Sequence, residues 1–265
     1  MLAATRSELI RLRRKGVMIG WLGLMALFAV LINMVVFQAA TGGTAAPGNG
    51  PGVTFPSLAA LSGPSGPVAG LGAASSMFGV VTLAFWAVVT ATDYSTGLIR
   101  LLASAQPRRL LLMTGKVAAL TIWTAAATSM ALLVNVLVAP AAARAAGVST
   151  AAWGADLVPI LASGWANAFA AMVVWGVIGL VLATVTRSSA VAISAGVGYV
   201  LVVEMILRTV ASGSAKWLPG STLTALAEGG SAELSYASAL ALGAAYVLLG
   251  LGLAGLVFTR RAITD

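Results

Sequence analysis

Long apolar stretches separated by short polar segments dominate the sequence. A helix of roughly 20 apolar residues crosses a bilayer core of about 30 Å, and six stretches of this chain reach that length. The pattern therefore predicts an all-α integral membrane protein, with residues 1–265 forming a single transmembrane domain. The predicted spans are residues 16–38, 68–92, 110–139, 157–185, 189–207 and 236–259.

Composition agrees with this pattern and narrows the chemistry. Hydrophobic residues make up 60% of the chain and charged residues 8%, whereas about a quarter of the residues in a soluble domain are charged. The chain contains neither histidine nor cysteine, which removes the commonest general base and the usual nitrogen and sulfur metal ligands. We therefore expect no catalytic, metal-binding or cofactor-binding residue in this chain.

The net charge of +8 reports membrane orientation. Basic residues flank the apolar spans instead of lining one soluble face, so nucleic acid is not an expected partner. With the N-terminus in the cytoplasm, the inner segments hold twelve basic residues and the outer segments three: Arg144, Arg208 and Lys216. Positive charge gathers on the cytoplasmic side of membrane proteins. Both termini are therefore predicted to lie inside, which an even number of spans allows.

Two segments outside the spans have helical patterns. Residues 2–15 place four apolar side chains on one side, although Arg6 and Arg13 share that arc. They predict an N-terminal in-plane elbow helix, the alternative being a cluster of charges that only sets topology. Residues 210–235 follow the fifth span and predict a short outer re-entrant segment, with a plain surface loop as the alternative. The long uncharged stretch 39–67 predicts an outer loop.

The inner loop after the second span is the most informative segment. Apolar side chains of residues 94–104 share one helical face, and polar ones share the other. Asp93 or Ser95 is expected to cap this short helix, and Pro107 suits the first turn of the next one. The residues alone leave two interpretations open: a helix that lies on the inner membrane surface, or a docking element for a cytoplasmic partner.

This loop resembles that of type-2 ABC exporter permeases. An acidic residue, a glycine, a short amphipathic helix, a basic pair and a lysine follow one another in the order of that family. Two positions depart from the family pattern, because Asp93 stands where glutamate is usual and Leu98 where threonine is usual. The resemblance implies that nine residues couple the chain to an ATPase: Asp93, Gly97, Arg100, Leu101, Leu102, Pro107, Arg108, Arg109 and Lys116.

The resemblance also implies partners and a location. Such permeases pair as two six-span subunits in the bacterial plasma membrane, either as a homodimer or with a sister permease. Each subunit docks a cytoplasmic ABC ATPase, with membrane lipid around the bundle. This chain lacks a phosphate-binding loop, since Gly115-Lys116 is followed by neither Ser nor Thr. ATP and Mg²⁺ are therefore expected on the partner ATPase pair.

Polar side chains within the spans are candidates for a substrate path. Charge inside a membrane is costly, and Glu204 can pair with Arg208 four residues later or line that path. The asparagines are alternatively hydrogen bonds between helices, and the second-span residues are alternatively packing. The candidate path residues are Ser75, Ser76, Phe78, Asn33, Asn135, Asn167 and Glu204.

The sequence allows three alternatives to ATP-driven export. An ion-gradient-driven secondary transporter usually needs intramembrane ionisable residues, and Glu204 is the clear candidate. A membrane enzyme would need a carboxylate pair, and none is evident. A non-transporting anchor that relays ATPase motion would share the same architecture. The exporter is the favoured interpretation. Drugs, lipids, peptides and antibiotics fit it equally well as substrates.

Overall fold

The computed structural model describes residues 2–13, 15–41, 55–98, 109–210 and 216–260, and all regular structure in these ranges is helical. Six of the described helices are long and apolar enough to cross a membrane, which confirms a multi-pass, all-helical architecture. These spans are Gly16–Thr41, Ser75–Ser95, Leu110–Ala146, Leu157–Thr186, Ser189–Leu207 and Tyr236–Arg260.

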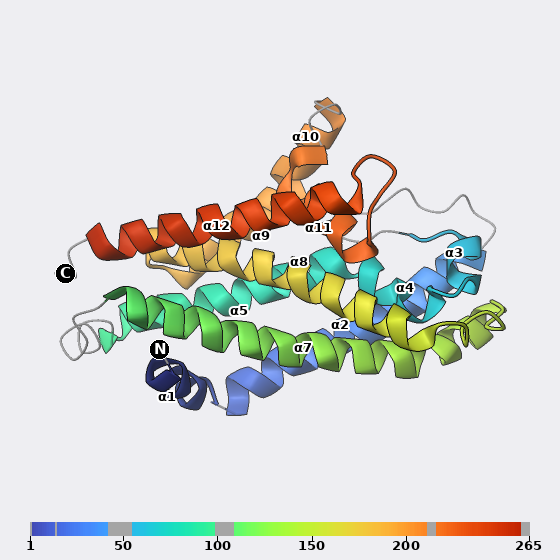
Figure 1. Cartoon of the computed structure of the whole chain (residues 1–265), viewed down its shortest axis with the longest axis horizontal. Helices are drawn as coiled ribbons and strands as arrows, with labels where there is room; N and C mark the ends of the chain where they lie inside the picture. Colours follow the sequence, from blue (N-terminus) through green and yellow to red (C-terminus); the bar gives the residue numbers. More distant parts are fainter. Residues whose placement is uncertain (1, 14, 42–54, 99–108, 211–215, 261–265) are drawn as a thin grey trace.

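The helices follow one another along the chain as follows (Figure 1). The first half contains α1 (Leu2–Leu12), α2 (Lys15–Thr41), α3 (Leu58–Ser62), α4 (Gly66–Ala73), α5 (Ser75–Ser95) and α7 (Arg109–Ala146). The second half contains α8 (Leu157–Thr186), α9 (Ser189–Gly198), the π-helical turn η1 (Tyr199–Val203), α10 (Glu204–Val210), α11 (Pro219–Glu228) and α12 (Tyr236–Arg260).

Three spans differ in detail from the sequence prediction. The predicted second span is divided at Ala74 into α4 and α5. The third continues seven residues past residue 139 through Pro140 to Ala146, because the alanines that surround the proline have the highest helix propensity. The fifth is interrupted by η1, a π-helical turn of the kind that occurs as a single turn inside α-helices. Each difference changes where a side chain points without changing the number of spans.

The packing centre lies between α5 and α8, where glycines meet tryptophans. Trp86 of α5 and Trp175 of α8 are fully buried. A methyl group on Gly176 would lie 2.4 Å from the Trp86 ring, and one on Gly79 would lie 2.1 Å from the Trp175 ring. Membrane helices gain little from hydrophobic burial against each other, so they depend on small residues that permit close van der Waals contact.

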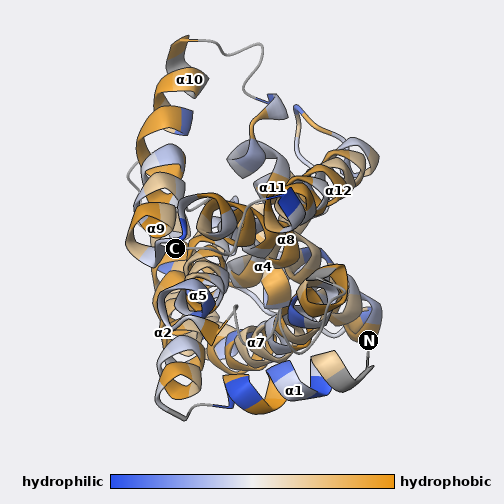
Figure 2. Ribbon diagram, turned by 90° about the vertical axis from the view of Figure 1, so that its left-hand side faces the viewer, coloured by the Kyte–Doolittle hydropathy of each residue, from blue (hydrophilic) through white to orange (hydrophobic). Residues whose placement is uncertain are grey.

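Short helices cover both ends of the bundle. α1 lies across one end and contacts α7, and the C-terminal end of α12 lies at this same end (Figures 1 and 2). α3, α4 and the start of α8 lie at the opposite end (Figure 1). α11 is packed against α4, α5, α8 and α12. Helices therefore occupy the positions predicted for the elbow helix and for the segment before the last span.

Candidate functional site

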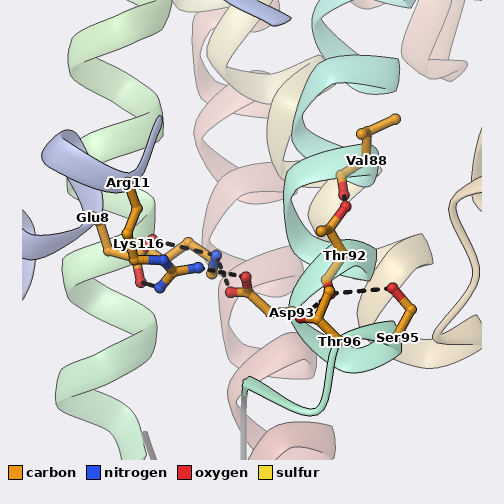
Figure 3. Close-up of polar contacts among 8 residues, drawn as sticks. All are labelled: Glu8, Arg11, Val88, Thr92, Asp93, Ser95, Thr96 and Lys116. Atoms are coloured by element: carbon orange, nitrogen blue, oxygen red, sulfur yellow. Dashed lines mark hydrogen bonds and ion pairs between the residues drawn. The ribbon is translucent and has the colours of Figure 1, made fainter. Parts of the chain in front are cut away.

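Four charged side chains from three helices form an ionic cluster at the α1 end of the bundle. Glu8 and Arg11 come from α1, Asp93 from α5 and Lys116 from α7 (Figure 3). Arg11 lies 2.6 Å from a Glu8 carboxylate oxygen and 2.5 Å from Oδ1 of Asp93. The Lys116 ammonium lies 2.5 Å from Oδ2 of Asp93 and 3.5 Å from Oε2 of Glu8. Each carboxylate therefore contacts both cations.

Burial makes this cluster different from a surface ion pair. Glu8 is 6% exposed, Asp93 3% and Lys116 9%, so the three groups have lost most of their contact with solvent. A buried charge is tolerated only when partners replace its hydration. Two carboxylates facing two cations meet that requirement, and removing one member leaves a buried charge without its main partner.

Close backbone contact brings α1 into position for this cluster. A methyl group on Gly115 would lie 2.7 Å from the Cβ of Ala4, so the glycine allows α1 to lie directly on α7. Glu8 and Arg11 are three positions apart and share one face of α1. Ile10 points away and is 62% exposed. The face of α1 packed on the bundle therefore carries Glu8 and Arg11.

The cluster lies where the chain enters and leaves the loop between α5 and α7. α5 continues to Ser95, and Gly97 follows with a φ of +68°, a conformation that glycine adopts without strain. The predicted cap at Asp93 is wrong, because Asp93 is an internal residue of α5 paired with Arg11 and Lys116. Tyr94 also belongs to α5 and not to a separate short helix.

The predicted coupling residues fall into two sets, those that the structure describes and those that lie outside the described residues. Asp93 and Lys116 meet in the ionic cluster, and Gly97 forms the turn after α5. Arg100, Leu101, Leu102, Pro107 and Arg108, the side chain of Arg109 and most of the predicted coupling helix lie outside the described residues. Sequence reasoning missed Glu8 and Arg11 as partners. The sequence feature that could have revealed them is Glu8 itself, the one acidic residue in the basic segment 2–15, three residues before Arg11.

A groove opens beside the cluster. It has a volume of about 310 Å³ and is lined by Arg11 and Asp93 together with apolar side chains of α1, α2 and α5, among them Leu12, Val17 and Val88. Leu98, the last described residue before the loop, also lines it. The groove therefore brings α1 and the beginning of the loop to one surface.

Two predicted path residues hold helices together. The Asn33 side-chain amide donates to Oδ1 of Asn135 at 2.7 Å and to the Ala29 carbonyl at 2.7 Å. Asn135 in turn donates to the carbonyl of Pro67. Both asparagines are buried. They thus join α2, α7 and α4 in the way expected for hydrogen bonds between membrane helices.

The remaining uncharged path candidates lie in different places. Ser75, Ser76 and Phe78 are buried on α5, and Ser76 shares a 3.1 Å hydrogen bond with Thr224 of α11. Asn167 accepts a 2.8 Å hydrogen bond from the Tyr236 hydroxyl. The structure therefore does not gather the predicted path residues into one site.

Glu204 lies at the start of α11 in space, although it begins α10 in the chain. Its carboxylate accepts hydrogen bonds from the backbone N–H of Gly220 at 2.9 Å and of Ser221 at 2.7 Å. Negative charge is favourable at a helix N-terminus, where the first N–H groups lack helical partners. The buried carboxylate thus caps α11 from another helix. The Arg208 side chain, its predicted partner, lies outside the described side chains.

Replacing Glu204 with glutamine should loosen α11. Glutamine keeps one acceptor oxygen, but its NH₂ group faces an N–H group that it cannot bond. The loss of a charge-assisted bond should lower the unfolding free energy by about 1.5–3 kcal/mol, measured as a reduced unfolding midpoint of the purified protein. Glu233→Gln, the same change at an exposed position, is the control. Equal midpoints for the two variants would contradict the capping role.

Comparison with protein families and with curated proteins identifies no relative. No protein-family model matches the chain, and no curated protein matches it significantly. Among the described residues, no group of three or more acidic side chains is arranged to hold a metal ion. The ionic cluster and the loop that it flanks are therefore the features that bear on function.

Proposed function

We propose that this chain is the membrane-spanning permease subunit of an ATP-driven exporter of the type-2 ABC class, which docks a separate cytoplasmic ATPase. One observation carries the proposal. Asp93 and Lys116 stand on either side of the inner loop, and a single buried cluster holds both against α1. A force applied to the loop is therefore transmitted to α1, α5 and α7 together.

The same arrangement gives the loop a mechanical role. ATP binding by the partner would close the ATPase pair and push the loop, and we assign the coupling element to the part of the predicted segment that follows α5. Because buried ion pairs break only at high cost, the cluster would move as a unit and tilt α5 and α7 against the rest of the bundle. Two such subunits would then alternate between inward and outward access.

The remaining assignments belong to this proposal. α1 would lie in the inner membrane surface as the elbow helix, with exposed Ile10 toward lipid, and α11 would be the outer re-entrant segment. Both termini would face the cytoplasm of a bacterial cell, in agreement with the distribution of basic residues. ATP and Mg²⁺ would bind on the partner ATPase pair.

A co-purification experiment tests the proposal. The tagged chain is isolated from its native membrane, and the associated ATPase is measured by ATP hydrolysis and mass spectrometry. Leu102→Asp places a charge in the expected contact, where its desolvation would cost several kcal/mol, so the ATPase should be lost or its hydrolysis uncoupled from transport. Ser7→Asp is the control, because it places the same carboxylate at an exposed and already polar position of α1.

Each outcome has a definite meaning. Loss of the ATPase with Leu102→Asp and its retention with Ser7→Asp would support the docking role of the loop. Equal recovery and equal transport with both variants would contradict that role. Recovery of the ATPase with wild type but without transport of any solute would favour a non-transporting anchor instead.

A further inference from the structure

The side of α1 that faces away from the bundle carries two exposed arginines with an apolar residue between them. Arg6 and Ile10 are exposed residues of α1, and they are four positions apart. Arg13 is also exposed, and its backbone N–H continues the last turn by donating to the Ile10 carbonyl at 3.3 Å. Residues at these spacings share one helical face. The two arginines are therefore two turns, or about 10 Å, apart along that face.

The positive charge of this outer face is not balanced by neighbouring acidic side chains. The ionic cluster pairs two carboxylates with two cations, so its own net charge is zero. Glu8 and Asp93 are the described carboxylates at this end of the bundle, and both are buried within that cluster. In the part of the chain that the structure describes, neither Arg6 nor Arg13 forms an ion pair. Both guanidinium groups can therefore bind an external anion.

The position of α1 places its outer face at the boundary of the membrane. α2 begins at Lys15, two residues after Arg13, and the first span begins at Gly16. Val17 and Ile19 of α2 are 45% and 69% exposed, as expected for apolar side chains that contact lipid. Figure 2 looks roughly along the spans and shows α1 at the edge of the bundle, beside α7. The outer face of α1 therefore lies at the level of the lipid headgroups, where the first span enters the membrane.

The side chains of this face match a lipid phosphate better than a soluble anion. Arginine presents a planar fork of N–H donors that can bind two oxygens of one phosphate group. Ile10 lies between the two arginines and is 62% exposed. Helices that lie in the membrane interface combine basic residues with apolar side chains that enter the acyl boundary in this way. A water-soluble anion would bind the arginines but make no use of the isoleucine.

We propose that the outer face of α1 binds the headgroups of anionic phospholipids through Arg6 and Arg13. The inference goes beyond the exporter assignment and does not depend on ATPase docking. Zwitterionic lipids carry a phosphate too, but their own positive group weakens its attraction to the arginines, so the face selects lipids by net charge. The opposite face of α1 is joined to α5 and α7 by the ionic cluster. Anionic lipids would therefore hold α1 between the membrane surface and the bundle.

The cysteine-free sequence permits a direct test. Ser7 is exposed and adjoins Arg6, and it is changed to cysteine in the full chain and labelled with a fluorophore. The labelled protein is reconstituted into phosphatidylcholine nanodiscs without any ATPase. A minor fraction of the lipid carries a nitroxide quencher, either on phosphatidylglycerol or on phosphatidylcholine. The quantity measured is the ratio of quenching by the anionic lipid to quenching by the zwitterionic one.

The expected result is a preference for the anionic lipid that depends on the two arginines. At low ionic strength, labelled phosphatidylglycerol should quench several-fold more strongly than labelled phosphatidylcholine, and added salt should weaken this preference by screening. The double variant Arg6→Gln with Arg13→Gln should lose nearly all of it. The matched control, Arg144→Gln with Lys216→Gln, removes the same charge at the far end of α7 and ahead of α11, and it should keep the preference.

Several results would overturn the proposal. Equal quenching by the two lipids, an unchanged preference in the arginine double variant, or an equal loss in the control variant would each show that this face does not select anionic lipid. Inorganic phosphate is added in a further arm, against chloride at the same ionic strength. If phosphate alone removed the preference, the ligand would be a soluble phosphate and not a lipid. Because the assay contains no ATPase, its failure would leave the co-purification result unaffected.

Discussion

Replacing Asp93 with asparagine should destabilise the protein by about 3–5 kcal/mol, the usual cost of removing one partner from a buried ion pair. Asp93 faces Arg11 and Lys116, both at 2.5 Å. Without it, two cations would share the single carboxylate of Glu8, and Lys116, 9% exposed, would keep one contact at 3.5 Å. The measurement is the unfolding midpoint of the purified protein in detergent.

Two further variants test whether the loss of stability comes from the buried charge at position 93. Asp156→Asn is the control, because Asp156 is exposed and has a φ of 52°, which asparagine accepts readily; this change should have little effect. The double variant Asp93→Asn with Lys116→Met removes one charge of each sign and keeps the pair of Arg11 and Glu8. It should be more stable than Asp93→Asn alone, and a strictly additive double variant would refute the cluster as an energetic unit.

The double variant also has a functional use. If the cluster transmits the motion of the loop, the double variant should stay folded and bind the ATPase, yet show weaker coupling between hydrolysis and transport. Recovered stability together with normal coupling would mean that the cluster only holds α1 in place.

Replacing Gly179 with alanine should disrupt the packing of α5 against α8. The added methyl group would lie 2.3 Å from the carbonyl oxygen of Leu83 and 3.0 Å from its Cα. A backbone cannot rotate away as a side chain can, so the two helices must separate. Overpacking typically costs about 1–3 kcal/mol, occasionally more, and here it would also weaken the neighbouring contacts of Trp86 and Trp175 with glycine.

Gly252→Ala is the matched control for this prediction. Gly252 lies within α12 and a methyl group there meets nothing within 4 Å, so the change should be neutral or slightly stabilising because alanine favours helices. Size-exclusion profiles and unfolding midpoints of the two variants decide the question. If Gly179→Ala behaves like Gly252→Ala, the close contact between α5 and α8 is not a determinant of stability.

Sequence alone predicted the number of spans and their approximate positions. The fifth predicted span, 189–207, agrees in both bounds with the apolar helical stretch, and the last differs by one residue. The reason is physical: lipid offers no hydrogen bonds, so an apolar stretch of this length must form a helix that satisfies its own backbone. Helices before the first span and before the last were also predictable from local patterns.

Only the tertiary structure decided which side chains meet. Glu8 and Asp93 lie far apart in the chain, yet share Arg11 and Lys116 because α1 lies on Gly115. Glu204 caps a helix that begins 15 residues later, at Pro219, and Asn167 of α8 meets Tyr236 of α12. Such contacts depend on how each helix is rotated and how closely it packs. Hydropathy identifies a span, but the fit of glycine against tryptophan and of carboxylate against cation determines its orientation.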